Sequence, residues 1–285
     1  MSSPRHHPNE LGAFLRARRA ALSPGAVGLP RTVGSRRVRG LRREEVASLA
    51  SISTDYYTRV EQGRRRPSAQ VAEVLAGVLR LSEDERAYLL ELVGTELPER
   101  PEETAPAVQP SLRRLLDALT AVPALVLGPR MDILAWNPMA AALITDFSEL
   151  PDAHRNYAWL LFRDPAVRAL HPDFDTVAPG CVAMLRREAG RDPHDPRMDG
   201  LVRELCHADE SFRRWWGEHH VAAGNRGTKV LRHPGVGDLT LDWDALTCAH
   251  DPAQRFVIWT TAPGSPSEKR LAALSDLTRT AARPL

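Results

Sequence analysis

Cysteine is scarce in this chain of 285 residues, which has only Cys181, Cys206 and Cys248. An odd, widely spaced set without a CxxC pair excludes a disulfide scaffold and a structural zinc finger, and it is typical of a reducing cytoplasm. The chain also lacks an apolar run of the roughly 20 residues that span a bilayer. Its first ten residues lack the hydrophobic stretch of a secretory signal. We therefore expect a cytoplasmic protein without a membrane segment.

Catalytic and metal-binding motifs are also missing. The sequence contains no GxSxG, HExxH or P-loop motif and no glycine-rich turn between a strand and a helix. Small clusters such as His207 with Asp209 lack a third ligand at metal-binding spacing. We therefore expect a protein that is not an enzyme, with no catalytic residue, no metal and no cofactor.

Charge is distributed unevenly along the chain. Residues 1–66 hold 14 arginines and five acidic residues, a balance of +9, whereas residues 67–285 hold 24 basic and 31 acidic residues, a balance of −7. All six tryptophans lie in the second part. These differences predict a basic N-terminal part that contacts a polyanion and an acidic C-terminal part that holds a core or a pocket.

Composition and periodicity divide the chain into domains. Residues 95–109 are rich in proline and acid, which predicts a semi-rigid linker. We expect a disordered tail over 1–8, an all-helical domain over 9–94, an α+β domain over 110–267, and a C-terminal helix or tail over 268–285. The predicted fold class is therefore a two-domain protein, an all-α headpiece followed by an α+β domain.

The most informative segment runs from Leu41 to Ser68. It predicts two short helices joined by a tight turn at Ser51-Ile52-Ser53, with Ser53 capping the second helix. Tyr57 and Val60, three residues apart, are expected to face inward. The side chains left outward are polar or aromatic, namely Thr54, Asp55, Tyr56 and Arg59. A helix with one buried side and such an outward side is shaped for the major groove of DNA.

These residues resemble the lambda-repressor-like helix-turn-helix family, also called XRE. The matching segments are Glu45-Val46-Ala47, Ala50-Ser51-Ile52-Ser53, Tyr57, Val60-Glu61-Gln62-Gly63 and Arg66-Pro67-Ser68. The resemblance implies that Arg43 and Gln62 bind phosphates and that Thr54, Asp55 and Arg59 face base edges. It also implies that Glu61 pairs with a helix-1 arginine, Arg19 by spacing. The alternative is a helical bundle whose charged face is merely solvated.

Two positions depart from the family pattern. Ser51 replaces the usual turn glycine, and Asp55 is an acid at a DNA-facing position. Asp55 would either accept a hydrogen bond from cytosine or repel a phosphate, and the sequence leaves both open.

Further arginines flank the predicted helices. The segment 22–40 is either a disordered surface loop or an arm that wraps the DNA backbone or enters the minor groove. The additional candidate DNA contacts are Arg36, Arg37, Arg39, Arg64 and Arg65.

The C-terminal part resembles the MmyB-like ligand-binding domain, a PAS-like fold. The matching segments are DILAWNPMAAAL, HRNYAWLLFRDPAVRALHPDF, FRRWWGEHHV, GTKVLRHPGVGDLTLDW and QRFVIWTTAPGSPS. The resemblance implies a ligand-responsive transcription regulator, and it associates the domain with fatty-acid-like ligands.

Large apolar residues of this part would line a pocket for an acyl chain. The candidates are Trp136, Phe162, Met184, Trp215 and Trp259, and Arg155 is the candidate anchor for a carboxylate. Arg187, His219 and Arg232 are further candidate anchors. Core packing and structural salt bridges are the competing interpretations for these positions.

The expected partners follow from both parts. One recognition helix reads few base pairs, so we expect a homodimer on an inverted repeat in double-stranded DNA. The second partner is a small apolar or acyl ligand. In the alternative hypothesis, the C-terminal domain only dimerises the protein or binds a protein partner.

Overall fold

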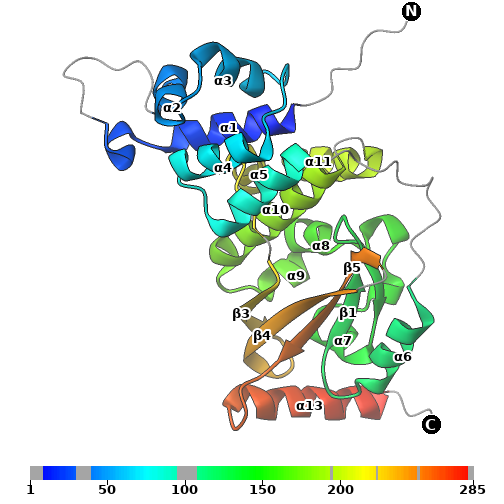
Figure 1. The fold of residues 1–285 in the computed structure, drawn as a ribbon. Coiled ribbons are helices and arrows are strands. Elements are labelled where there is room, and N and C mark those ends of the chain that lie inside the picture. The colour runs from blue at the N-terminus through cyan, green and yellow to red at the C-terminus, as the bar shows by residue number, and fades with distance from the viewer. Residues whose placement is uncertain are drawn as a thin grey trace, which may run out of the picture. The chain divides into compact units, whose positions relative to one another are not determined.

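The structure of this chain is a computed structural model, and it describes residues 9–29, 40–94, 108–192, 195–222, 224–248 and 251–281. The chain divides into two compact units (Figure 1). The first unit takes in the described residues of 1–100, 186–199 and 214–223. The second unit takes in those of 101–185, 200–213 and 224–285.

Helices alone form the described part of the first unit that precedes residue 95. They are α1 (Glu10–Ala21), α2 (Arg43–Leu49), α3 (Thr54–Glu61), α4 (Ala69–Val78) and α5 (Glu83–Gly94), with a short 3-10 helix, η1 (Pro24–Val27), after α1. Asn9, Ser53 and Ser68 cap α1, α3 and α4 by accepting a backbone amide at 2.9, 3.1 and 3.3 Å. Ser82 and Glu85 form a capping box before α5. The predicted all-helical headpiece is confirmed.

The core of this unit forms where α1 packs against α3 and α5. Phe14 of α1 and Tyr88 of α5 meet edge to face, with ring centres 5.2 Å apart. Tyr57 and Val60 of α3 are fully buried, as their spacing predicts. Burying a large apolar side chain contributes about 1.5–3 kcal/mol. This burial determines which face of α3 remains exposed.

The turn between α2 and α3 has two backbone hydrogen bonds. The amide of Ser51 donates to the carbonyl of Ser48 at 3.1 Å, and the amide of Ile52 donates to that of Ala47 at 3.0 Å. Ser51 has a φ of +53°, a left-handed conformation that costs a residue with a side chain about 1–2 kcal/mol. The turn is therefore tight, and its serine is more strained than a glycine would be.

Two segments from later in the sequence complete the first unit. They include the end of α10 (Phe174–Arg191) and the end of α12 (Glu210–Gly217). Arg186 donates to a carboxylate oxygen of Glu10 at 3.0 Å, and Tyr88 donates to the same oxygen at 3.1 Å. A Cβ on Gly190 would lie 2.1 Å from the Tyr88 hydroxyl. Glycine therefore allows α10 to approach α5 closely.

Further polar contacts join these segments to the headpiece helices, and one ion pair joins two of the headpiece helices. Arg187 of α10 lies 2.6 Å from Glu91 of α5. Arg18 of α1 lies 2.6 Å from Glu85 and also donates to the carbonyl of Glu218. Because the Arg18 side chain is only 8% exposed, the surrounding protein screens these contacts less than water would.

An antiparallel five-stranded sheet forms the centre of the second unit, in the order β2-β1-β5-β4-β3. The strands are β1 (Ala124–Leu127), β2 (Ile133–Trp136), β3 (Arg226–His233), β4 (Gly237–Cys248) and β5 (Asp251–Thr260). The early hairpin pairs with the last strand, so that Leu125 lies opposite Val257. This arrangement confirms the predicted α+β part.

Helices complete the second unit around this sheet. They are α6 (Pro110–Ala118), α7 (Pro138–Leu143), α8 (Tyr157–Arg163), α9 (Pro165–Ala169) and α13 (Pro266–Ala281), with short 3-10 helices η2 (Phe147–Glu149) and η3 (Asp152–His154). The unit also includes α10 up to residue 185, α11 (Pro196–Ala208) from residue 200 and the start of α12. α13 packs against α7 and β4. Among the described residues, no helix is both long enough and apolar enough to span a membrane.

Candidate nucleic-acid interface and ligand domain

The outward face of α3 carries the exposed side chains of Thr54, Asp55 and Arg59. Its opposite face is buried through Tyr57 and Val60. The helix is short and capped at its start, and its polar outward side chains lie in its first two turns. This geometry suits insertion of the helix N-terminus into a major groove.

An ion pair joins two of these outward side chains. Arg59 Nη2 lies 2.9 Å from Asp55 Oδ2, one helical turn away, and both side chains are more than half exposed. Such exposed pairs contribute little to stability. Asp55 therefore orients Arg59 along the outward face. Little free energy is lost if the Arg59 side chain leaves Asp55 for another hydrogen-bond acceptor.

Other predicted contacts surround the end of α3. Tyr56 is half-buried, and the guanidinium of Arg65 lies over its ring at 4.9 Å. Gln62 and Arg64 are exposed, so the polar and basic surface continues past the helix end. The remaining predicted contacts lie outside the described residues, namely Arg36, Arg37 and Arg39.

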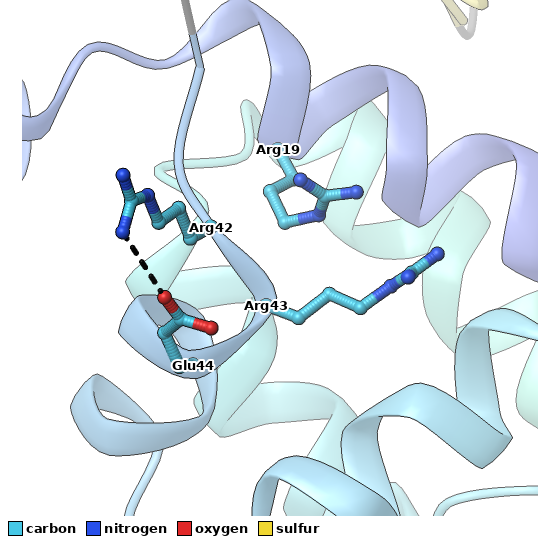
Figure 2. A pocket seen from close by; sticks show the side chains of 4 residues that line it. All are labelled: Arg19, Arg42, Arg43 and Glu44. Atoms are coloured by element: carbon cyan, nitrogen blue, oxygen red, sulfur yellow. Dashed lines mark hydrogen bonds and ion pairs between the residues drawn. The ribbon is translucent and has the colours of Figure 1, made fainter. Parts of the chain in front are cut away.

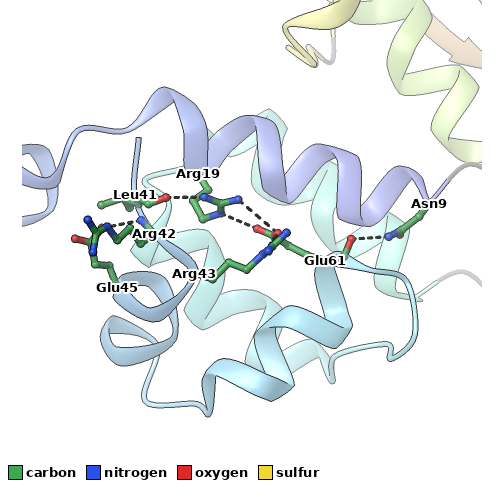
Figure 3. Close-up of polar contacts among 7 residues, drawn as sticks. All are labelled: Asn9, Arg19, Leu41, Arg42, Arg43, Glu45 and Glu61. Carbon is green, nitrogen blue, oxygen red and sulfur yellow. Dashed lines mark hydrogen bonds and ion pairs between the residues drawn. The ribbon is translucent and has the colours of Figure 1, made fainter. Parts of the chain in front are cut away.

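The side chain of Glu61 is completely buried at the meeting point of α1, α2 and α3 (Figure 3). Arg19 Nε donates to Glu61 Oε1 at 2.7 Å, and Arg43 Nε donates to Glu61 Oε2 at 2.7 Å. Arg19 also donates to the carbonyl of Leu41 at 2.6 Å, and Asn9 donates to the carbonyl of Glu61 at 2.7 Å. One carboxylate therefore links the recognition-type helix to two others. Arg43, assigned to phosphate binding from the sequence, is also one of its partners.

The negative charge of Glu61 raises the pKa values of two neighbouring side chains, Tyr57 and Arg19. Burial raises the pKa of Tyr57, and the nearby carboxylate raises it further. Burial alone would lower the pKa of Arg19, but the hydrogen bond and charge of Glu61 outweigh it and the pKa is raised. Both groups therefore stay protonated, and Arg19 stays positive.

An open pocket of about 460 Å³ lies beside this network (Figure 2). Its lining consists of Arg19, Arg42, Arg43 and Glu44. The Arg42 and Arg43 side chains are 52% and 41% exposed, and Arg42 lies 3.4 Å from Glu44. Three guanidiniums line the pocket, and their two acidic partners, Glu61 and Glu44, leave one net positive charge among these groups, so the pocket is cationic. Guanidinium groups bind phosphate oxygens through paired N–H donors.

Comparison with known families decides the assignment of both parts. Residues 10–89 match a helix-turn-helix domain. Residues 108–274, more than half of the chain, match the MmyB-like transcription regulator ligand binding domain. The chain belongs to the MmyB-like transcription regulators. Comparison with curated proteins finds no match. The MmyB-like chain is thus a ligand-regulated transcription regulator with a helix-turn-helix DNA-binding domain.

The candidate ligand residues of this MmyB-like regulator lie in separate clusters of the structure. Trp136 packs on Phe147 with ring centres 5.3 Å apart, and Arg155 lies over the Trp136 ring at 5.8 Å. Met184 of α10 and the buried Trp259 of β5 also belong to the second unit.

Phe162 and Trp215 are the two remaining candidates. Phe162 meets the rings of Phe174 and Phe212 edge to face, at 5.5 and 5.0 Å. Trp215 lies in the first unit, where the guanidinium of Arg214 is 5.3 Å from its ring.

Each candidate carboxylate anchor already has a protein partner. Arg155 lies 2.8 Å from Asp152, and Arg232 lies 3.1 Å from Asp238. In the first unit, Arg187 pairs with Glu91 and His219 lies 3.6 Å from Glu10. The structure thus gives these four side chains structural partners.

A half-buried cation of the MmyB-like regulator escaped the sequence analysis. Lys229 of β3 donates to the Tyr157 hydroxyl at 3.0 Å inside the second unit. Lysine occurs only twice in the chain, at Lys229 and Lys269, and Lys229 lies two residues before buried Leu231, on the same face of the strand. The rarity of lysine in the chain and the two-residue spacing of Lys229 from an apolar strand residue are the sequence features that could have identified it.

Proposed function

We propose that this MmyB-like regulator reads DNA with α3, as an XRE-type headpiece over residues 9–94. The observation that carries the proposal is the exposed face of Thr54, Asp55 and Arg59 on a helix whose opposite side is fully buried. Base-edge contacts supply sequence specificity, and arginine is the commonest side chain that reads guanine. Arg59 is therefore assigned to a base edge.

Phosphate contacts come from the surrounding cations. The pocket of Arg19, Arg42 and Arg43 is cationic and open, and Arg64 and Arg65 are exposed beyond α3. Contacts to phosphates position the protein without reading sequence, and they make affinity fall with salt. We assign Arg43 and Gln62 to this group.

The DNA target is an inverted repeat bound by a homodimer. α3 has eight residues, and a single helix of this length reads too few base pairs for useful specificity. A two-fold pair of headpieces doubles the number of base pairs read.

The regulating ligand is a fatty-acid-like molecule bound within residues 110–267, which follow a linker over 95–109. The family supports a small-molecule ligand. Aromatic clusters such as Phe162 with Phe174 and Phe212 support an apolar one. Each buried methylene contributes about 0.8 kcal/mol. A chain of about twelve carbons therefore reaches micromolar affinity without a strong polar contact.

The Arg59→Ala variant should lose about 1–3 kcal/mol of binding free energy on a selected operator and little on random DNA. The Arg43→Ala variant should weaken both complexes alike and reduce the slope of log affinity against log salt by about one. Fluorescence anisotropy on both DNAs across a salt series measures these effects.

The Arg113→Ala variant is the matched control, since it removes an exposed arginine from α6 in the second unit. It should leave both affinities unchanged. Equal losses on operator and random DNA for Arg59→Ala would exclude Arg59 from base reading.

A further inference from the structure

One face of the five-stranded sheet is covered by α6 over only part of its width. Leu116 of α6 packs in one cluster with Val126 of β1 and Phe256 of β5. Leu246 of β4 lies directly opposite Phe256, and directly opposite residues of antiparallel strands point to the same face. Phe256 is 4% exposed, whereas Leu246 is 54% exposed. Among the described residues, the apolar cover of this face therefore ends between β5 and β4.

The open part of this face has acidic side chains beside the leucine. Asp242 and Asp244 precede Leu246 at two-residue intervals along β4, so the three side chains share one face. Asp242 is exposed and accepts a hydrogen bond from Thr228. Asp244 is half-buried and lies opposite Arg226 in the strand register. Asp242, Asp244 and Leu246 are called the strand patch below.

The helix α6 has an exposed side of its own. Four exposed residues recur there at the i, i+3, i+4 and i+7 spacing that places side chains on one side of a helix. They are Ser111, Arg114, Leu115 and Ala118, called the helix patch below. Leu115 is 45% exposed. Within the described part of the chain, Arg114 has no ion-pair partner. The helix patch is therefore small and apolar, with one available cation.

The two patches are complementary in shape and charge. Each contains one exposed leucine, and the neighbouring charge is positive in the helix patch and negative in the strand patch. Contact between the two leucines would remove apolar surface from water, which is favourable. Opposite charges beside such a contact fix its register and disfavour wrong partners.

A second copy of the chain can bring the two patches together. Within one chain they cannot cover each other, because buried Leu116 holds α6 over β1 and β5. Across a two-fold axis, each surface of one protomer meets the complementary surface of its partner, and the same contact occurs twice. Because one chain carries both halves of the contact, the surface fits a second copy better than a different protein.

We propose that the helix patch of one protomer packs on the strand patch of its partner and forms the homodimer contact of the second unit. Leu115 packs against Leu246 of the partner subunit, and Arg114 pairs with Asp244 of the partner subunit. This inference rests on the proposed homodimer and names its contact surface.

Sedimentation velocity of the full chain without DNA, over a concentration series, measures the dissociation constant of the dimer. Wild type should dimerise. The Leu115→Glu and Leu246→Glu variants should each raise this constant about tenfold or more, because each places a carboxylate against an apolar surface. Both positions are exposed in the single chain, so far-UV circular dichroism spectra should match wild type. Leu277→Glu is the matched control, since Leu277 of α13 is 57% exposed, and it should dimerise as wild type does.

A double-mutant cycle tests the polar pairing. The Arg114→Gln and Asp244→Asn variants should each weaken the dimer about fivefold, because the remaining charge loses its partner. The combined variant should lose no more than either single variant, because both substitutions remove the same contact. Arg113→Gln is the matched control, because Arg113 is exposed on a different side of α6, and its dimer should be as tight as that of wild type.

The outcomes distinguish the surface from the homodimer. A wild-type dimer that both leucine variants leave intact would overturn the surface and leave the homodimer standing. Losses that multiply in the combined Arg114→Gln and Asp244→Asn variant would overturn the pairing of these two residues. A wild type that stays monomeric at every concentration would overturn both proposals, and it would assign the patches to a contact within one chain or with a different protein.

Discussion

The Glu61→Ala variant should lower the free energy of unfolding of the first unit by about 3–5 kcal/mol. Its carboxylate is completely buried and takes one 2.7 Å hydrogen bond each from Arg19 and Arg43. Removing one side of a buried ion pair leaves a charge without its partner, which costs about this much. The variant removes the partner of two arginines and the polar link between α1, α2 and α3. DNA affinity should fall with stability.

Hydrogen–deuterium exchange of the α1 and α3 amides in the full chain measures this loss directly. The Glu44→Ala variant is the matched control, because Glu44 is 63% exposed and its contact with Arg42 is 3.4 Å long. Exchange in that variant should match wild type. Unchanged protection of α1 and α3 in Glu61→Ala would show that the buried network contributes nothing to the headpiece.

The Arg186→Ala variant should destabilise the same unit by about 3–5 kcal/mol from a different position in the sequence. The Arg186 side chain is 3% exposed and lies 3.0 Å from Glu10. It also donates to the carbonyl of Trp216 and lies over that ring at 3.8 Å. Its removal leaves Glu10 with Tyr88 and His219 as neighbours.

Acid sensitivity gives this prediction a second observable. Burial alone would raise the pKa of Glu10, but the nearby His219 and the charge of Arg186 outweigh it, so the pKa is lowered. A carboxyl with a lowered pKa stabilises the fold above its unfolded pKa, and this contribution is lost as pH falls through the folded value. Without Arg186, burial is less opposed, so the pKa of Glu10 rises. Acid unfolding should then begin at a higher pH.

Circular dichroism during acid titration follows this transition. The Arg213→Ala variant is the control, because Arg213 is 61% exposed and lies 3.9 Å from Glu210. Its acid transition should coincide with that of wild type. Coincident transitions for Arg186→Ala and wild type would show that the Glu10–Arg186 pair does not stabilise the unit.

Local sequence signals predict the headpiece well. Ser53 caps α3, and the inward spacing of Tyr57 and Val60 is borne out by their complete burial. Such features depend on neighbours within four residues, so a single sequence contains them. The approach of Arg43 to the same carboxylate as Arg19 depends on how α2 packs, which no local pattern specifies.

Long-range packing is what the sequence could not reveal. Glu10 and Arg186 are 176 positions apart, and periodicity alone cannot show that the end of α10 contacts α1. In the sheet, the two-residue repeat of the strand places Lys229 on the same face as buried Leu231. The buried atoms of His171 and Trp259 without a hydrogen-bond partner in the described part of the chain become visible only once the strands and helices are packed. For the same reason, the sequence offered Arg155 and Arg232 as anchors, although both pair with nearby acids.

Operator affinity with and without a carboxylic acid tests the central claim most directly. The claim is that an apolar acid bound in the C-terminal domain changes how tightly the helix-turn-helix domain binds DNA. A ligand shifts such an equilibrium only by its differential affinity for the two states. Binding of the full chain to an operator selected from random DNA is measured with and without the saturated acid that binds tightest. We predict an affinity change of at least tenfold in the presence of saturating acid. Identical operator affinity in wild type with and without saturating acid would contradict the account.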